Sequence, residues 1–247
     1  MRWTAIVAVM LPCFCGAAAE NFWLLRGSET WSASEVRQMV TDSPWAREAL
    51  VRPANQAMGS AGPTPSLIGP DPDQAAAARL AGEPPSAAPR ILVRWESALP
   101  VYEACARGGM EQPFSSCVSK VLYLSNLGGK FEQLSRNFYI LSMSGYPALP
   151  ADNAPQHSEA ANAALERMSR KIQRSTFLKR SGKKALQAER VMTLPAGNAL
   201  LVIVLFPRTE LLSLADKKVV FESADPRFEL TASFNLARMA YQGSLAL

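Results

Sequence analysis

The strongest constraint on the fold is a set of strand-like segments in the last third of the chain. Residues 200–206 form the most apolar run after the N-terminal segment, and their length and β-branched content are typical of a central strand. In residues 227–234, Phe228, Leu230, Ala232 and Phe234 alternate with polar or charged residues. This alternation is expected for a sheet with one wet face. Residues 218–223 precede it across a short turn, so we predict an antiparallel hairpin.

Further strands and helices can be read upstream of this hairpin. Strand candidates cover residues 91–96, 137–144, 176–180 and 191–194, with turn signals at 181–182 and 195–198. Helix candidates cover residues 97–106, with Ser97 as the N-cap, 116–127, stopped by Gly128-Gly129, and 158–174. The sequence therefore predicts an α+β domain over residues 90–247, in which helices pack on one face of a largely antiparallel sheet.

A short helical arm and a linker are predicted before this domain. Ser32 and Glu35 have the spacing of a capping box, and Val36, Met39 and Val40 share one helical face. We assign residues 20–52 to this arm. Residues 53–89 hold eight of the 18 prolines and many Ala, Gly and Ser residues, a composition typical of a linker or long loop.

Residues 1–19 carry the three parts of a secretory signal peptide. Met1 and Arg2 give a positive start, residues 3–14 are an apolar run too short to span a bilayer, and three alanines precede Glu20. The alternative interpretation is a buried N-terminal helix of a cytosolic protein. We predict cleavage after Ala19 and export to the periplasm or the extracellular space, with no membrane-spanning segment in the mature chain.

The cysteines are consistent with export. Of the four cysteines, Cys105 and Cys117 remain after the predicted cleavage. An even number in an oxidising compartment favours a disulfide between them, and two buried free thiols are the alternative.

Several chemistries have no support in the sequence. The chain has one histidine, His157, so a multi-histidine metal site is excluded, and no phosphate-binding or dinucleotide-binding motif is present. We predict no metal and no cofactor. The formal net charge of +5 does not demand a nucleic-acid partner, and none is expected. Carboxylates remain the available acid–base groups, although no spacing selects a pair of them. The candidates are Asp42, Glu48, Glu96, Glu103 and Asp225.

One charge cluster stands out as a candidate anion-binding patch. Residues 167–190 contain nine basic residues and one acid, Glu189. We assign the patch to Arg167, Arg170, Lys171, Arg174, Lys179, Arg180, Lys183 and Lys184. A solvated helix face, followed by a hairpin whose lysines discourage edge pairing, is the alternative.

The C-terminal residues resemble those of a known group of proteins. Residues 216–221 (DKKVVF) and 234–243 (FNLARMAYQG), with the apolar tail after them, resemble the end of exported bacterial proteins named for a GWxTD motif, although that string is absent here. Residues 92–98 and 178–183 are similar to segments of secreted proteins that share this tail. The resemblance implies no enzyme activity, cofactor or site residue.

Two function classes follow from these observations. The first is a non-enzymatic secreted or envelope-associated protein that binds an anionic envelope surface, a polysaccharide or an acidic protein. The second is a carboxylate-based hydrolase that acts on cell-wall or external polysaccharide. The oligomeric state does not follow from the sequence.

Overall fold

The computed structural model describes residues 21–54, 89–111, 113–124, 128–148 and 158–247. The predicted signal peptide, most of the predicted linker and His157 lie outside these residues. The fold is α+β, as predicted from the sequence, and its strands pair antiparallel. The strands form two five-stranded sheets rather than one, together with a small two-stranded ribbon near the C-terminus, formed by β11 (Ala240–Tyr241) and β12 (Ser244–Leu245).

The first sheet has the strand order β1-β3-β4-β8-β7. Its strands are Ala46–Glu48, Leu92–Trp95, Phe138–Pro147, Ala199–Pro207 and Arg190–Ala196. β8 contains the apolar run predicted to be a central strand, and it lies between β4 and β7. A register shift in β4 between Met143 and Tyr146 coincides with Gly145, whose φ of 80° suits glycine.

The second sheet has the strand order β2-β10-β9-β5-β6. Its strands are Leu50–Pro53, Phe228–Asn235, Lys218–Asp225, Thr176–Arg180 and Leu186–Gln187. β9 and β10 are the predicted hairpin, with Phe228 opposite Asp225. The side chains of β10 alternate between buried and more exposed positions, as the sequence pattern indicated.

At each of two edges, a segment of the chain pairs first with one sheet and then with the other, and so joins the two sheets. Ala49 donates its backbone N–H to Ile91 beside β3, and the next residue, Leu50, pairs with Thr231 of β10. At the opposite edge, Ala188 bonds to Thr176 of β5, and Glu189 bonds to Leu205 of β8. Strands that switch sheets in this way form the corners of a flattened, closed barrel. Because β1 continues into β2 and β6 continues into β7, the ten strands make a barrel of eight. Side chains can fill the interior of a barrel of that size.

Aromatic side chains from both sheets fill the interior. Trp95 contacts Tyr139 and Phe234 edge to face, and Phe206 meets Phe221 across the sheets. These residues belong to one continuous buried cluster. The barrel is thus a packed core that holds its surface elements in fixed positions.

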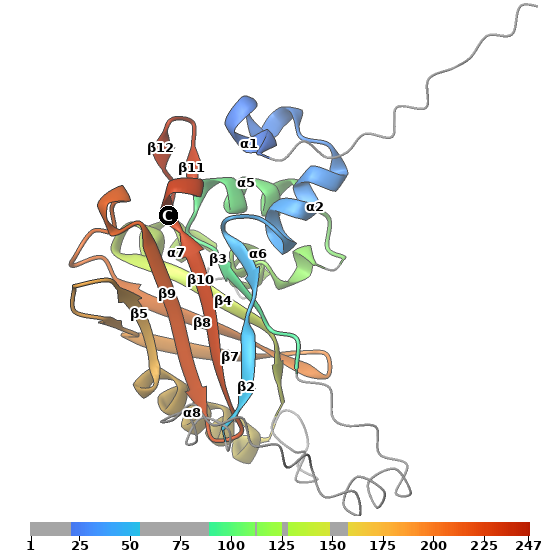
Figure 1. The fold of residues 1–247 in the computed structure, drawn as a ribbon. Helices are drawn as coiled ribbons and strands as arrows, with labels where there is room; N and C mark the ends of the chain where they lie inside the picture. Colours follow the sequence, from blue (N-terminus) through green and yellow to red (C-terminus); the bar gives the residue numbers. More distant parts are fainter. Residues whose placement is uncertain (1–20, 55–88, 112, 125–127, 149–157) are drawn as a thin grey trace, which may run out of the picture.

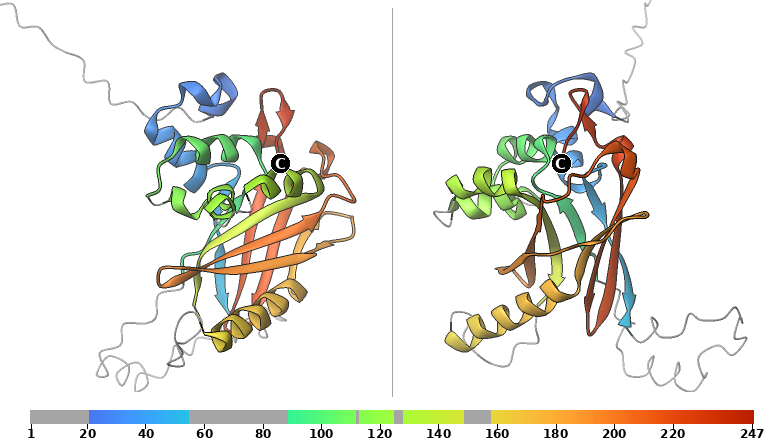
Figure 2. Two further views of the ribbon diagram at one scale, coloured as in Figure 1. Left: turned by 180° about the vertical axis from the view of Figure 1, so that it is seen from behind. Right: turned by 90° about the vertical axis from the view of Figure 1, so that its left-hand side faces the viewer.

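Helices cover the outer face of the first sheet and both ends of the barrel. α5 (Leu99–Arg107), α6 (Val118–Leu124) and α7 (Gly128–Asn137) accompany a second buried cluster. In that cluster, Val118 and Phe131 pack with Ile140 and Ile203 on the outer side of β4 and β8. α8 (Glu159–Arg174) lies across one end of the barrel, and α1 (Phe22–Leu25), α2 (Ala33–Thr41) and α5 lie toward the other (Figures 1 and 2).

Two local predictions about helix ends were wrong. Among the described residues, the helix predicted over residues 116–127 covers Val118–Leu124 (α6), and Gly128-Gly129 begins a helix that the sequence did not predict, α7. The N-cap of α5 is Ala98, because the Ser97 hydroxyl accepts the backbone N–H of Ile140 and so belongs to the sheet. The capping box of Ser32 and Glu35 is present at the start of α2, as predicted.

The N-terminal segment does more than form a helical arm. α2 is present, but residues 46–53 continue as β1 and β2 and pair with both sheets. Phe22, Trp31 and Trp45 are fully or almost fully buried in the main cluster, and the Trp45 indole N–H donates to the carbonyl of Ala246 at 2.6 Å. The sequence did not reveal these strands because each is short and its partners lie far along the chain.

Candidate anion-binding surface

α8 is held rigidly against the end of the barrel. Ser158 caps the helix by accepting the backbone N–H of Ala161 at 3.2 Å. Met168 and Ile172 are buried in the barrel cluster, and the hydroxyl of Ser169 lies 2.9 Å from that of Thr193 in β7. One face of the helix is therefore fixed, and the opposite face is directed to solvent.

Four cations lie along the solvent face of α8. Arg167, Arg170, Lys171 and Arg174, together with Ser175, line an open hollow of about 540 Å³. Residues spaced three and four apart share one face of a helix. At 1.5 Å per residue, the row from Arg167 to Arg174 is about 10 Å long. We call these four residues the α8 stripe.

The α8 stripe is only weakly neutralised by neighbouring acids. Arg170 pairs with Glu166 at 3.5 Å, and both side chains are more than half exposed. Exposed pairs of this kind contribute little free energy. Within the described part of the chain, Arg167, Lys171 and Arg174 have no ion pair. The stripe therefore presents a row of available positive charge.

The remaining cations of the predicted patch do not belong to this surface. Lys179 pairs with Glu222 at 2.6 Å, Arg180 with Glu210 at 2.5 Å and Lys183 with Asp216 at 2.6 Å. Arg180 is only 5% exposed because it shares the inward face of β5 with Leu178. Lys184 is exposed in the turn after β5. The structure thus places four of the eight cations along α8 and three in ion pairs, and anion binding by the eight residues stays a prediction.

Glu210 and Asp216 are ionised at neutral pH. The hydrogen bond and charge of Arg180 hold the pKa of Glu210 below its usual value. Burial raises the pKa of Asp216, but hydrogen bonds from Lys183 and the backbone of Ser213 outweigh it and lower the pKa. Arg180 and Lys183 are therefore occupied in holding the loop that carries both acids.

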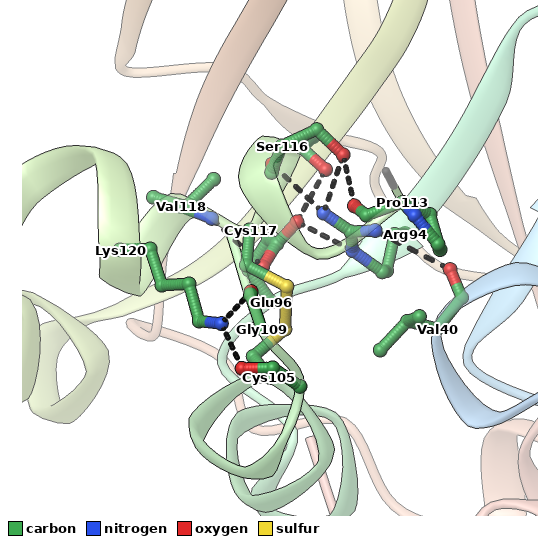
Figure 3. The surroundings of a disulfide bond; sticks show 12 residues. Val40, Arg94, Glu96, Cys105, Gly109, Pro113, Ser116, Cys117, Val118 and Lys120 are labelled. Carbon is green, nitrogen blue, oxygen red and sulfur yellow. Dashed lines mark hydrogen bonds and ion pairs between the residues drawn. A yellow bond between two sulfur atoms is a disulfide. The ribbon is translucent and has the colours of Figure 1, made fainter. Parts of the chain in front are cut away.

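A second charged centre lies buried beside the disulfide (Figure 3). The Arg94 guanidinium donates to Glu96 at 2.7 Å, to the Ser116 carbonyl at 2.8 Å and to the Val40 carbonyl at 3.3 Å. Glu96 also accepts the Ser142 hydroxyl at 2.6 Å and the backbone N–H of Val118 at 3.2 Å. Because both charges are almost completely buried and well bonded, this centre connects β3, α2 and α6 structurally.

The buried ion pair of Arg94 with Glu96 was not predicted from the sequence. The pattern of residues 91–96 predicts an ordinary strand, in which Glu96 is only a catalytic candidate. The available signal was the two-residue spacing of Arg94 and Glu96, which places both side chains on one face of a strand.

The predicted disulfide is confirmed. Cys105 and Cys117 are bonded, with their Cα atoms 6.0 Å apart. The bond joins α5 to the start of α6, and Lys120 adds a second link by donating to the carbonyls of Gly108 and Gly109. Glu96 lies close to both sulfurs, and these three residues form the one potential metal-ligand group of the described residues. The sulfurs are bonded to each other and Glu96 to Arg94, so this arrangement does not fit a metal ion.

The five candidate carboxylates are each engaged by a different neighbour. The partners are Arg47 for Asp42, Arg90 for Glu48, Arg94 for Glu96, Tyr241 for Glu103, and Arg227 with Tyr146 for Asp225. Burial and Asp225 raise the pKa of the Tyr146 hydroxyl, and Arg227 lowers that of Asp225 against the effect of burial. These contacts are those of caps, turns and ion pairs.

Among the described residues, no helix has the length and apolar character needed to cross a membrane. A comparison of the chain with protein families, with curated proteins and with solved structures finds no match.

The geometry of the described residues singles out the α8 stripe as the candidate site, because its four basic side chains lie on one face of a single helix that packs against the barrel.

Proposed function

We propose that this protein is an exported, non-enzymatic binding protein whose α8 stripe binds a linear polyanion, most simply an acidic polysaccharide. The observation that carries the proposal is the open row of four cations on a helix fixed to the barrel. Because the helix is already ordered, binding does not require the protein to fold first, which lowers the entropic cost of association.

The shape of the stripe favours an extended ligand over a small anion. Its hollow is open and its row of cations is about 10 Å long, whereas a small anion is usually held by converging donors in an enclosed site. No large apolar side chain of α8 is among the exposed ones of the described residues. A surface that is charged but not apolar suits a hydrated, charged polymer better than a lipid bilayer.

Export is part of the same proposal. The signal-peptide pattern of residues 1–19 and the resemblance of the C-terminal residues to exported GWxTD proteins support it, and a disulfide is favoured in an oxidising compartment. No contact of the described residues favours the alternative of a carboxylate-based hydrolase.

The test is binding of the purified exported protein to an acidic polysaccharide such as polygalacturonate, with a neutral polysaccharide for comparison. Replacing Arg167, Lys171 and Arg174 with Gln should weaken binding about tenfold at low salt, if each exposed charge contributes roughly 0.5 kcal/mol. Wild-type binding should also weaken as salt is added, because exposed charges are screened.

A matched control removes three exposed cations elsewhere. The variant with Arg37, Arg52 and Arg136 replaced by Gln changes the net charge equally, and these exposed residues lie in α2, β2 and α7. It should retain most of the binding. Equal loss in the two variants would show a general charge effect, and unchanged binding in the α8 variant would refute the proposal.

A further inference from the structure

The connection from β8 to β9, residues 208–217, carries two exposed leucines on an anchored backbone. We call it the leucine loop. Leu212 is buried and donates its backbone N–H to the Tyr139 hydroxyl at 2.8 Å. Ser213 and Asp216 form a capping box around a short 3-10 helix, η3 (Leu214–Asp216). Leu211 and Leu214 are nevertheless 71% and 55% exposed. The loop therefore holds these side chains outward on a fixed frame.

Cations surround the two leucines. The ion pairs of Arg180 with Glu210 and of Lys183 with Asp216 hold the loop beside the β5–β6 turn, and the backbone N–H of Leu236 bonds to the Lys217 carbonyl. Both acids of the loop are thus already paired. The exposed cations nearby that form no ion pair with a described residue are Lys184, Lys217, Lys218 and Arg238. The surface around the leucines has a local excess of positive charge.

We infer that the leucine loop and these four cations bind the surface of an anionic lipid bilayer. A bilayer interface offers an acyl region for apolar side chains and phosphate headgroups for cations, side by side. A soluble polyanion would use the cations and leave both leucines in water. The two leucines are already held outward by an anchored backbone, and their transfer from water into the bilayer interface lowers the free energy.

This surface is distinct from the α8 stripe. α8 lies across one end of the barrel, and the leucine loop lies toward the opposite end, where the C-terminus of the chain is found (Figure 2). The inference stands on the leucines and their surrounding charges, so it does not depend on what the stripe binds. If both hold, the protein can contact a lipid surface and a polyanion at the same time.

The test is partition of the exported protein onto phosphatidylcholine vesicles with and without phosphatidylglycerol. Replacing Leu211 and Leu214 with Ser should lower the partition coefficient on the anionic vesicles about tenfold, since each side chain loses part of its burial. Replacing Lys184 and Lys218 with Gln should lower it about thirtyfold at low salt, at roughly 1 kcal/mol for each cation. Salt should abolish the effect of the lysine variant and preserve that of the leucine variant, because only the charges are screened.

Two further variants separate this surface from others. Replacing Leu50 and Met110 with Ser removes apolar side chains that are 56% and 57% exposed elsewhere, and should leave partition unchanged. The Gln variant of the α8 stripe should also bind vesicles normally, whatever happens to its polysaccharide binding. The inference is overturned if the leucine variant partitions like wild type, if the Leu50/Met110 control loses as much, or if the α8 variant alone abolishes vesicle binding.

Discussion

Replacing Arg94 with Met should destabilise the fold far more than removal of any exposed cation. Arg94 is fully buried, and its guanidinium is the charged partner of Glu96, which is 1% exposed. Methionine is apolar and unbranched, so it fills the space of the inner, aliphatic part of the Arg94 side chain. The change thus removes the charge and the hydrogen bonds and keeps that part of the packing.

The magnitude follows from the groups left behind. Glu96 keeps the Ser142 hydroxyl and the Val118 backbone N–H but loses its cation, and the carbonyls of Val40 and Ser116 lose their side-chain donor. Breaking a buried ion pair by removing one partner costs roughly 3–5 kcal/mol. We expect a loss of about 4 kcal/mol in the free energy of unfolding, which corresponds to about 10 °C in Tm for a chain of this size.

The assay is urea unfolding with the disulfide intact, together with a second variant that separates charge from packing. Combining Arg94→Met with Glu96→Gln replaces the orphaned carboxylate by a neutral amide that can still accept hydrogen bonds. The double variant should therefore be more stable than Arg94→Met alone. Arg47→Met, which breaks an exposed pair with Asp42 at 3.7 Å, is the control and should be close to wild type.

The reasoning fails if Arg94→Met costs less than about 1 kcal/mol, since that is within the range of an exposed ion pair. It also fails if the double variant loses as much as the two single variants together. Additive effects would mean that the side chains do not interact, contrary to their 2.7 Å contact.

Three further predictions follow from the same structure. Replacing Cys105 and Cys117 with Ala should lower the free energy of unfolding by about 3 kcal/mol, because the closed loop has a sequence separation of 12, and an unchanged urea midpoint would contradict this. The lowered pKa values of Glu210 and Asp216 mean that their ion pairs stabilise the fold above the ordinary carboxyl pKa and are lost as the pH falls below about 4. As the pH is lowered, amide hydrogen exchange in residues 208–217 should therefore rise at a higher pH than exchange in β8 and β9. A rise at the same pH in all three segments would argue against local release of the loop. A protease site placed within residues 55–88 should give a nicked protein whose two fragments stay together until denaturant is added, because β1 and β2 pair with both sheets. Separation of the fragments in native buffer would contradict this expectation and would support a domain that begins at residue 90.

Features that depend on neighbouring residues were predicted well. The capping box of α2, the β9–β10 hairpin and the apolar strand β8 each follow from residue spacing within one short segment. The disulfide was also predictable, because the predicted cleavage after Ala19 leaves two cysteines and so only one pairing. The α8 stripe was identified for the same reason, since helical periodicity places its four cations on one face.

Features that depend on distant parts of the chain were decided by the tertiary structure. β1 and β2 are too short to carry a strand pattern, and they form because β3 and β10, far along the chain, offer unpaired edges. The same closure turns Arg180 inward beside Leu178 and brings Glu210 to it, which divides the predicted patch. The sequence by itself determined the helices and strands whose pattern lies within one segment, and where positive charge is concentrated. Only the tertiary structure decided which charges are buried or paired, because burial and pairing depend on residues that meet through the fold rather than along the chain.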